Sequence, residues 1–182
     1  MPHTRGVTAA TPTPDQPFVV RAGGPDDADA LLALFDERVA WLAARGWTGQ
    51  WGAEPFSTSG RRVEQVRRWC AESEVRAAER DGRVQAFVVL GDHHDYVPAP
   101  DEPELYVQVL VAASGPAARG AGATLLDDAA RLAAGRGLAR LRVDCYAGND
   151  GRLVAYYRAQ GFEPTEPFTV RDWPGQLLVR RV

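Results

Sequence analysis

Two glycines separated by one residue are the feature of this sequence with the clearest chemistry. The segment Ala118-Arg119-Gly120-Ala121-Gly122-Ala123 follows an apolar strand predicted over 105–112 and opens a helix predicted over 120–134. Glycine lets the backbone turn without a Cβ in the way, and the first amides of a helix have no partner inside it. Because such converging N–H groups attract phosphate, we interpret this turn as a cradle for a pyrophosphate group.

A second short motif lies further along the chain. Tyr157 is followed four residues later by Gly161-Phe162, and Asn149 lies just past a strand predicted over 138–145. On its own, Tyr157 would more often be an amphipathic core residue. On its own, the glycine turn could equally be a phosphate site or a simple tight turn.

Other reactive side chains exclude several enzyme classes. Every basic side chain is arginine, so neither a P-loop lysine nor a Schiff-base lysine is present. His93-His94-Asp95 has no third histidine near it, and adjacent side chains diverge, so we expect a solvated loop and no metal site. Cys70 and Cys145 are far apart in apolar settings, which predicts reduced core thiols rather than a disulfide or a nucleophile.

Length and charge indicate one domain that binds neither nucleic acid nor a membrane. The chain has 182 residues, is 45% hydrophobic and carries a net charge of −3, and no apolar run reaches membrane-spanning length. Residues 1–114 hold 17 acids and 11 arginines, whereas residues 115–182 hold 7 acids and 10 arginines, so an anionic ligand would prefer the second part.

Residues 1–16 are rich in Pro and Thr and lack the pattern of a secretory or transit signal. We therefore expect a disordered leader over 1–16, a single domain over 17–182 and a cytoplasmic protein.

Hydrophobic periodicity predicts a sheet flanked by helices. Strands are predicted over 18–21, 75–80, 83–90, 105–112, 138–145, 168–170 and 177–180, and helices over 24–45, 61–70, 120–134 and 153–160. The Asp81-Gly82 dipeptide indicates a hairpin, and the strand–helix–strand unit over 105–145 requires a parallel strand pair. A mixed sheet with helices on both faces follows.

This order of elements and these motifs resemble the GNAT superfamily of acyl-CoA-dependent N-acyltransferases over roughly residues 17–182. The family signature, Gln/Arg-x-x-Gly-x-Gly/Ala, falls on Ala117-Ala118-Arg119-Gly120-Ala121-Gly122. Both glycines match, while Ala117 stands at the first position, where Arg119 would have to compensate for a missing side-chain contact. Tyr157-Arg158-Ala159-Gln160-Gly161-Phe162 matches the family's Tyr-x-x-x-Gly-Phe ending, and Trp173-Pro174-Gly175-Gln176 is similar to a subset of the family.

The resemblance implies a fold and an activity. The fold would be α/β (α+β), with a mixed, mostly antiparallel sheet of about seven strands, splayed strands 4 and 5, and helices on both faces. The activity would be transfer of an acetyl group from acetyl-CoA to an amine of a small molecule or peptide, by direct attack in a ternary complex. The implied partners are acetyl-CoA and the amine, with no metal, and a homodimer is left open.

The resemblance also assigns roles to individual residues. Tyr157 would protonate the leaving thiolate, a backbone N–H near Leu110 or Val111 would stabilise the oxyanion, and either Glu104 or a water relay would accept the amine proton. Trp51 and Tyr106 would line the acceptor pocket, and Trp47 would either join them or cover the first helix. The cofactor would contact Leu110, Val111, Ala112, Ala117, Ala118, Arg119, Gly120, Ala121, Gly122, Ala123, Asn149 and Tyr157.

Two alternatives stay open at this point. A non-catalytic acyl-CoA sensor would keep the glycine cradle without a general base. A dinucleotide-binding oxidoreductase would need a third glycine where this chain has Leu125, although Asp144 stands at a tolerable distance for a ribose contact.

Overall fold

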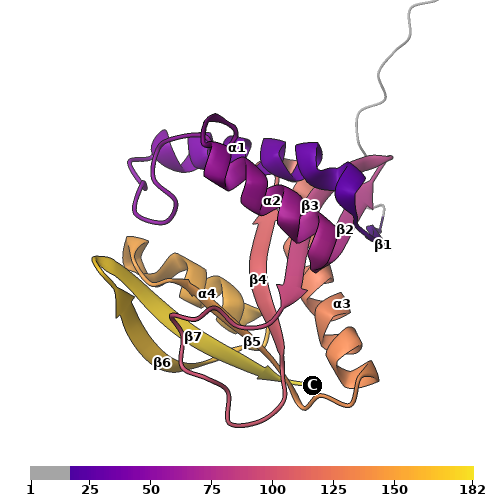
Figure 1. Ribbon diagram of the computed structural model, residues 1–182, viewed down its shortest axis with the longest axis vertical. Helices are drawn as coiled ribbons and strands as arrows, with labels where there is room; N and C mark the ends of the chain where they lie inside the picture. Colours follow the sequence, from indigo (N-terminus) through magenta and orange to yellow (C-terminus); the bar gives the residue numbers. More distant parts are fainter. Residues whose placement is uncertain (1–16) are drawn as a thin grey trace, which may run out of the picture.

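The structure is a computed structural model that describes residues 17–182, so the leader expected over residues 1–16 lies outside the described residues. The described chain folds into one central sheet with helices packed on it (Figure 1). The strands are β1 (Val19–Ala22), β2 (Glu74–Arg80), β3 (Arg83–Gly91), β4 (Leu105–Ala112), β5 (Arg140–Tyr146), β6 (Glu163–Val170) and β7 (Trp173–Arg181). The α-helices are α1 (Ala28–Ala43), α2 (Gly60–Glu72), α3 (Ala121–Gly135) and α4 (Arg152–Ala159).

The sheet is mostly antiparallel, as the sequence predicts. Its seven strands follow the order β1-β2-β3-β4-β5-β7-β6, and the β4–β5 pair is parallel while the other neighbours are antiparallel. The hairpin predicted at Asp81-Gly82 joins β2 to β3, and Asp81 adopts a φ of 54° that suits this turn. The helix that follows β4 supplies the crossover that a parallel pair requires.

Strands β4 and β5 separate after a short stretch of pairing. Their register runs from Leu105↔Leu141 to Val107↔Val143, after which β5 pairs with β7 alone and β4 with β3 alone. A bulge at Val89/Leu90 leaves Gln108 of β4 without an opposite residue. The second half of β4 therefore presents an edge toward β5 that β5 does not cover.

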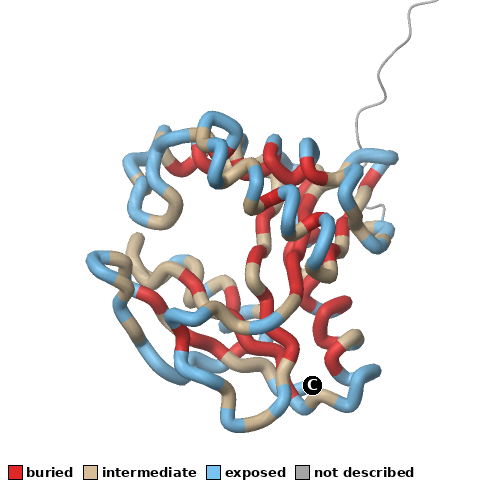
Figure 2. The backbone as a smooth tube through the Cα atoms, viewed as in Figure 1, coloured by how far each residue is buried: buried red, intermediate tan, exposed pale blue. Residues whose placement is uncertain are grey.

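Helices cover both faces of the sheet. Helices α1 and α2 pack with Phe87, Val109 and Val111 on one face, and α3 and α4 pack with Val88, Val107 and Val143 on the other. Alternate residues of each strand thus serve two separate cores. Figure 2 shows the buried residues concentrated where the central strands meet these helices.

The last two strands are longer than the sequence predicts. Apolar residues indicate strand only over 168–170 and 177–180, whereas β6 and β7 extend through Pro164, Pro167 and Pro174. Strand β6 lies at the edge of the sheet, where proline removes no ladder hydrogen bond, and its register shifts between Pro164 and Pro167. No helix in the described residues is long and apolar enough to cross a membrane.

Candidate functional site

The glycine turn forms the start of α3 and cannot carry larger side chains without cost. Gly120 caps the helix in the left-handed region, with φ 88°, where L side chains are strained. A Cβ on Gly122 would collide with the hydroxyl group of Tyr156. The first helical bond runs from Thr124 N–H to the Gly120 carbonyl at 3.0 Å, so the amides of residues 121–123 lie ahead of the hydrogen-bonded ladder. These amides are available to an anion at the helix terminus.

Two arginines from distant elements hold the loop between β4 and α3. Arg38 of α1 donates to the carbonyls of Ala112 at 2.6 Å and Ala113 at 3.2 Å. Arg80 of β2 donates to the Ala117 carbonyl at 2.9 Å. Burial lowers the pKa of Arg38, but an arginine stays charged in a protein. The sequence gives no local signal for these contacts, because each partner lies far from the loop along the chain.

A cavity of about 650 Å³ extends from the α3 terminus along the open edge of β4. Arg38, Arg119 and Arg152 line it, and none of its described lining residues is acidic. The cavity therefore favours an anionic ligand, in line with the positive charge expected for the second part of the chain. Most of the cofactor residues expected from the sequence lie on this wall: Leu110, Val111, Ala112, Ala118, Arg119, Gly120, Gly122, Asn149 and Tyr157.

Main-chain groups of Leu110 face the open edge of β4. The Ala113 N–H donates to the Gln85 carbonyl of the strand before it, at 2.9 Å. Because bonded and open positions alternate along an antiparallel ladder, Val111 is turned toward β3 and Leu110 toward the gap. The backbone N–H of Leu110 is therefore better placed than that of Val111 to donate to a group in the gap between β4 and β5.

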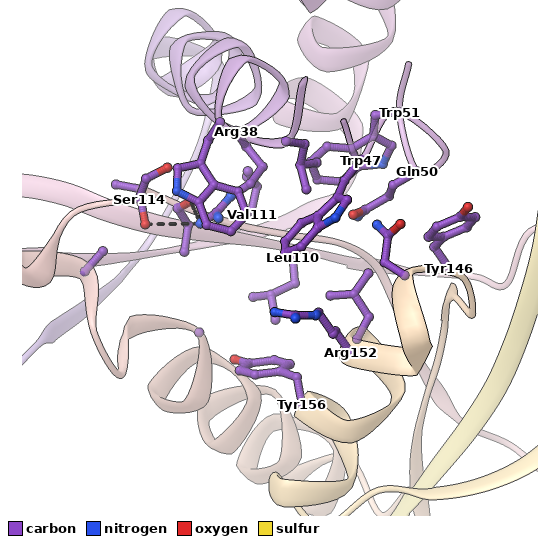
Figure 3. A pocket seen from close by; sticks show the side chains of 18 of the residues that line it. Arg38, Trp47, Gln50, Trp51, Leu110, Val111, Ser114, Tyr146, Arg152 and Tyr156 are labelled. Atoms are coloured by element: carbon purple, nitrogen blue, oxygen red, sulfur yellow. Dashed lines mark hydrogen bonds between the residues drawn. The ribbon is translucent and has the colours of Figure 1, made fainter. Parts of the chain in front are cut away.

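The loop between α1 and α2 covers the front of the cavity and contacts the opposite side. The Arg152 guanidinium lies 4.6 Å from the ring centroid of Trp47, and Trp173 Nε1 donates to the Gln50 carbonyl at 3.2 Å. Figure 3 shows Trp47 reaching down over Leu110 toward Arg152. We refer to residues 47–51 as the roof. Trp51 also packs edge-on against Phe35 of α1, so this tryptophan both lines the cleft and covers the helix.

A second cavity, of about 360 Å³, joins the first beneath the roof. Its walls are largely aromatic. The residues that line both cavities are Gln50, Trp51, Leu110, Tyr146, Leu153 and Tyr157. Tyr157 thus stands where a ligand along β4 would meet a ligand in the aromatic cavity.

Burial keeps the reactive groups at this junction protonated. Tyr157 is 6% exposed, and burial raises its pKa well above the usual value, with Cys145, Tyr156 and Asp144 acting in the same direction. Burial also raises the pKa of Cys145 to about 12. Tyr157 is therefore a phenol that can donate a proton, and Cys145 is a neutral thiol with little nucleophilic character. Both cysteines are buried and free, as expected from the sequence.

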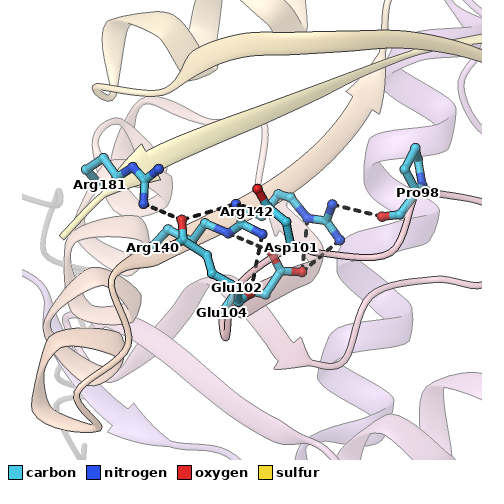
Figure 4. Close-up of polar contacts among 7 residues, drawn as sticks. All are labelled: Pro98, Asp101, Glu102, Glu104, Arg140, Arg142 and Arg181. Atoms are coloured by element: carbon cyan, nitrogen blue, oxygen red, sulfur yellow. Dashed lines mark hydrogen bonds and ion pairs between the residues drawn. The ribbon is translucent and has the colours of Figure 1, made fainter.

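Glu104 lies outside both cavities, contrary to what a general base would require. Its carboxylate is buried between β4 and β5, where Arg142 Nε donates to Oε1 at 2.9 Å and Arg140 Nε lies 3.2 Å from Oε2 (Figure 4). Burial raises the pKa of Glu104 although both arginines act to lower it. A raised pKa is common in catalytic carboxylates, but the Glu104 carboxylate lines neither cavity and is paired with two arginines.

Several other expected residues also lie away from the cavity surfaces. Tyr106 is fully buried behind the second cavity, and its hydroxyl donates to Asp144 Oδ1. Ala117, Ala121 and Ala123 belong to the turn but are not among the lining residues. Their backbone shapes the turn, whereas the Cβ-bearing faces point elsewhere.

The 93–95 loop is less solvated than expected. The His94 ring stacks on Tyr96 at 4.9 Å, meets Tyr106 edge-on and lines the second cavity. Within residues 17–182, no cluster of three or more His, Cys, Asp or Glu side chains could hold a metal ion.

A mostly antiparallel seven-stranded sheet with a splayed parallel β4–β5 pair and helices on both faces is a GNAT-like α/β fold. Residues 37–162 match the acetyltransferase (GNAT) family, a span that contains both the glycine turn and Tyr157. The chain belongs to this family and is an acetyl-CoA-dependent N-acetyltransferase. This membership decides against the dinucleotide-binding oxidoreductase. No curated protein sequence matches the chain.

Solved structures with this fold include three that cover nearly the whole chain. A GCN5-related N-acetyltransferase from Rhodopseudomonas palustris has a TM-score of 0.67 at 18% identity, covering 96% of this chain and 100% of that one. A ribosomal-protein-alanine N-acetyltransferase from Brucella melitensis has a TM-score of 0.62 at 22% identity, covering 90% and 99%. The Salmonella typhimurium protein yncA, solved with its cofactor acetyl-CoA, has a TM-score of 0.61 at 15% identity, covering 91% and 94%. These likenesses concern the fold.

Proposed function

We propose that this enzyme moves the acetyl group of acetyl-CoA to the amine of a small molecule or peptide, by direct attack while both substrates are bound. The meeting of the two cavities at Tyr157 carries this proposal. An acyl donor along β4 and an amine in the aromatic cavity would approach each other there. Holding two reactants in contact removes entropy from a two-substrate step, which is the largest contribution we expect.

The first cavity fits the parts of coenzyme A. The pyrophosphate would bind the amides of residues 121–123, with Arg119 and Arg152 within the same cavity. The amide arm would pair with the uncovered edge of β4 near Leu110, as an added strand does. Asn149 would contact the arm from the end of β5. When bound, acetyl-CoA would supply an electrophilic thioester carbonyl, and free coenzyme A would leave after transfer.

Two groups of the chain, together with a water relay, would then act on the reacting atoms. The Leu110 N–H would donate to the carbonyl oxygen as negative charge develops on it. Tyr157 would give its proton to the sulfur that leaves, and its raised pKa keeps that proton in place at neutral pH. A water relay in the open cleft would carry away the proton that the amine loses, since Glu104 lines neither cavity and is paired with Arg142.

An unbiased amine screen tests this function. Purified protein and acetyl-CoA are mixed with a panel of amines, free thiol is measured, and products are identified by a mass gain of one acetyl group. We expect acetylation of at least one amine, and weaker acetyl-CoA binding for Gly120→Glu, which places a carboxylate in the cradle. Absence of thiol release across the panel, together with unchanged acetyl-CoA affinity in Gly120→Glu, would overturn the proposal.

A further inference from the structure

The second cavity contains one carboxylate, and it stands beside the reaction site. Among the described residues that line either cavity, Asp144 is the sole acidic side chain. Asp144 follows the last β5 residue that pairs with β4, so its side chain emerges where the strands separate. Tyr157, at the junction, lines the same cavity.

Two phenols hold the Asp144 carboxylate in place. The Tyr106 hydroxyl of β4 donates to Oδ1, and the Tyr96 hydroxyl of the β3–β4 loop donates to Oδ2 at 3.4 Å. Tyr106 is fully buried and is therefore fixed by packing, whereas Tyr96 is 48% exposed and stacks on His94. A carboxylate has about four acceptor positions, so two such bonds leave lone pairs on both oxygens. The group is preorganised and can still accept hydrogen bonds from a ligand.

The rest of the cavity combines aromatic surface with positive charge on α2. Phe35, Trp51, Trp69 and Trp173 contribute aromatic surface. Arg61 and Arg62 lie on α2, across the cleft from β5, and Arg62 already donates to the carbonyls of Glu54 and Trp51. An ammonium group entering this space is thus drawn toward β5 and Tyr157, and away from α2.

We propose that Asp144 binds the ammonium group of the acceptor, and that the acceptor is a cationic primary amine carried on an aromatic or apolar body. This inference rests on the proposed function and names its substrate class. The ammonium would be held at the carboxylate by charge-assisted hydrogen bonds, and the body would pack on the aromatic walls. One ammonium proton would pass to the water relay before the neutral nitrogen attacks the thioester carbonyl. A volume of about 360 Å³ suits a small molecule. Asp144 would be a specificity-determining residue that sets the amine beside the junction.

Matched amines test the proposal. We would compare 2-phenylethylamine, which is cationic and aromatic, with butylamine, aniline and L-phenylalanine in the thiol-release assay at saturating acetyl-CoA. We expect 2-phenylethylamine to have the highest kcat/KM, because aniline is uncharged, butylamine lacks the ring, and phenylalanine adds a carboxylate close to Asp144. Equal or better use of aniline or phenylalanine would overturn the assignment.

The variant Asp144→Asn provides a second, independent test of the proposal. Asp172→Asn, on the exposed turn between β6 and β7, is the matched control. The change at position 144 keeps the size of the side chain but removes its charge. The KM for 2-phenylethylamine should therefore rise about 10- to 100-fold, the size of one charge-assisted contact of roughly 1.5–3 kcal/mol. Acetyl-CoA affinity and thermal stability should stay near those of the parent enzyme.

An unchanged KM for 2-phenylethylamine in Asp144→Asn would rule out a role for Asp144 in binding the amine. Absence of turnover with every amine in the parent enzyme would instead count against the proposed function.

Discussion

Tyr157 combines two properties that a proton donor needs: access to both cavities and a bound proton. Burial is the main reason for its raised pKa, and the nearby Asp144 charge adds to the effect. An acid whose pKa is raised stays protonated as the pH climbs through neutrality. We therefore expect no loss of rate from ionisation of Tyr157 between neutral and mildly alkaline pH.

Tyr157→Phe should lower the single-turnover rate about 100-fold, the lower range for general acid catalysis, without weakening acetyl-CoA binding. The substitution removes the hydroxyl and keeps the ring that packs on Phe162. A rapid-mixing assay of thiol release measures the chemical step separately from product release. Tyr156→Phe is the control, because the Tyr156 hydroxyl lies against Gly122 and does not line the second cavity. A Tyr157→Phe enzyme with the parent single-turnover rate would rule out the general-acid role.

Cys145 lines the second cavity but should take no covalent part in the reaction. Its thiol has a pKa of about 12 because of burial, so the nucleophilic thiolate is scarce at neutral pH. Cys145→Ala should therefore keep most of the turnover, with modest destabilisation from the lost packing. Intact-protein mass spectrometry after incubation with acetyl-CoA alone should show no acetylated enzyme. An acetyl group on Cys145, together with inactivity of Cys145→Ala, would contradict direct transfer.

At the scale of elements, the start of α3 depends on close contact between its backbone and α4. Gly122→Ala would push the Tyr156 hydroxyl toward the cofactor cavity, which both residues line. We expect the Kd for acetyl-CoA, measured by calorimetry, to rise several-fold. Gly135→Ala is the matched control: it ends the same helix, and its added Cβ would meet nothing within 4 Å. Equal affinities in the two variants would show that the cradle is not where the pyrophosphate binds.

The roof is the second element that we expect to act on the cofactor. Arg152 stacks on Trp47 across the cleft and adds positive charge to the first cavity. Arg152→Gln should raise KM for acetyl-CoA about 5- to 10-fold, with a smaller change in kcat, because one exposed cation–π and phosphate contact is worth about 1 kcal/mol. Arg158→Gln, an exposed position on the same helix, is the charge-matched control. If Arg152→Gln and Arg158→Gln raise the KM for acetyl-CoA equally, the effect comes from net charge, and the contact between Arg152 and Trp47 does not contribute to cofactor binding.

The elements themselves could be predicted where local signals are strong. Strand β4 and the β2–β3 hairpin follow from a largely apolar run and an Asp-Gly turn, and the structure has them at those positions. The lengths of β6 and β7 could not be predicted, since the prolines of β6 are tolerated only because that strand lies at an edge.

The sequence predicts the backbone turn of the candidate site, but it does not predict which distant side chains contact one another there. Gly120 and Gly122 stand in a local motif, so the sequence alone places them on the cradle. For Asp144 the sequence suggests only a ribose contact, because its neighbour Tyr106 lies 38 positions away and on another strand. The position of Glu104 outside both cavities could not be predicted for the same reason: alternation gives the face of the strand, but the depth along the splayed pair depends on where β4 and β5 separate.

At the scale of the whole molecule, the cleft exists because the sheet is divided. Strands β1–β4 with α1 and α2 form one part, and β5–β7 with α4 form the other. The two parts share only a three-residue ladder between β4 and β5 among the described strands. Glu104, Arg140 and Arg142 form a cluster beside this short ladder. Their ion pairs connect β4 to β5 in the part of the sheet where the two strands still lie together. We expect this cluster to control stability rather than chemistry.

Glu104→Gln should lower the free energy of unfolding by about 3 kcal/mol, because it leaves the charges of two buried arginines without their shared carboxylate. Arg142 would keep only its bond to the Pro98 carbonyl, at 2.9 Å, whereas Arg140 retains Asp101 and Glu102. Urea denaturation measures the change, and Asp101→Asn is the control, since that side chain is 88% exposed and its pair should contribute little. The folded Glu104→Gln enzyme, assayed well below its denaturation midpoint, should keep the parent kcat. A variant as stable as the parent but unable to turn over would return Glu104 to the chemistry and overturn the structural role.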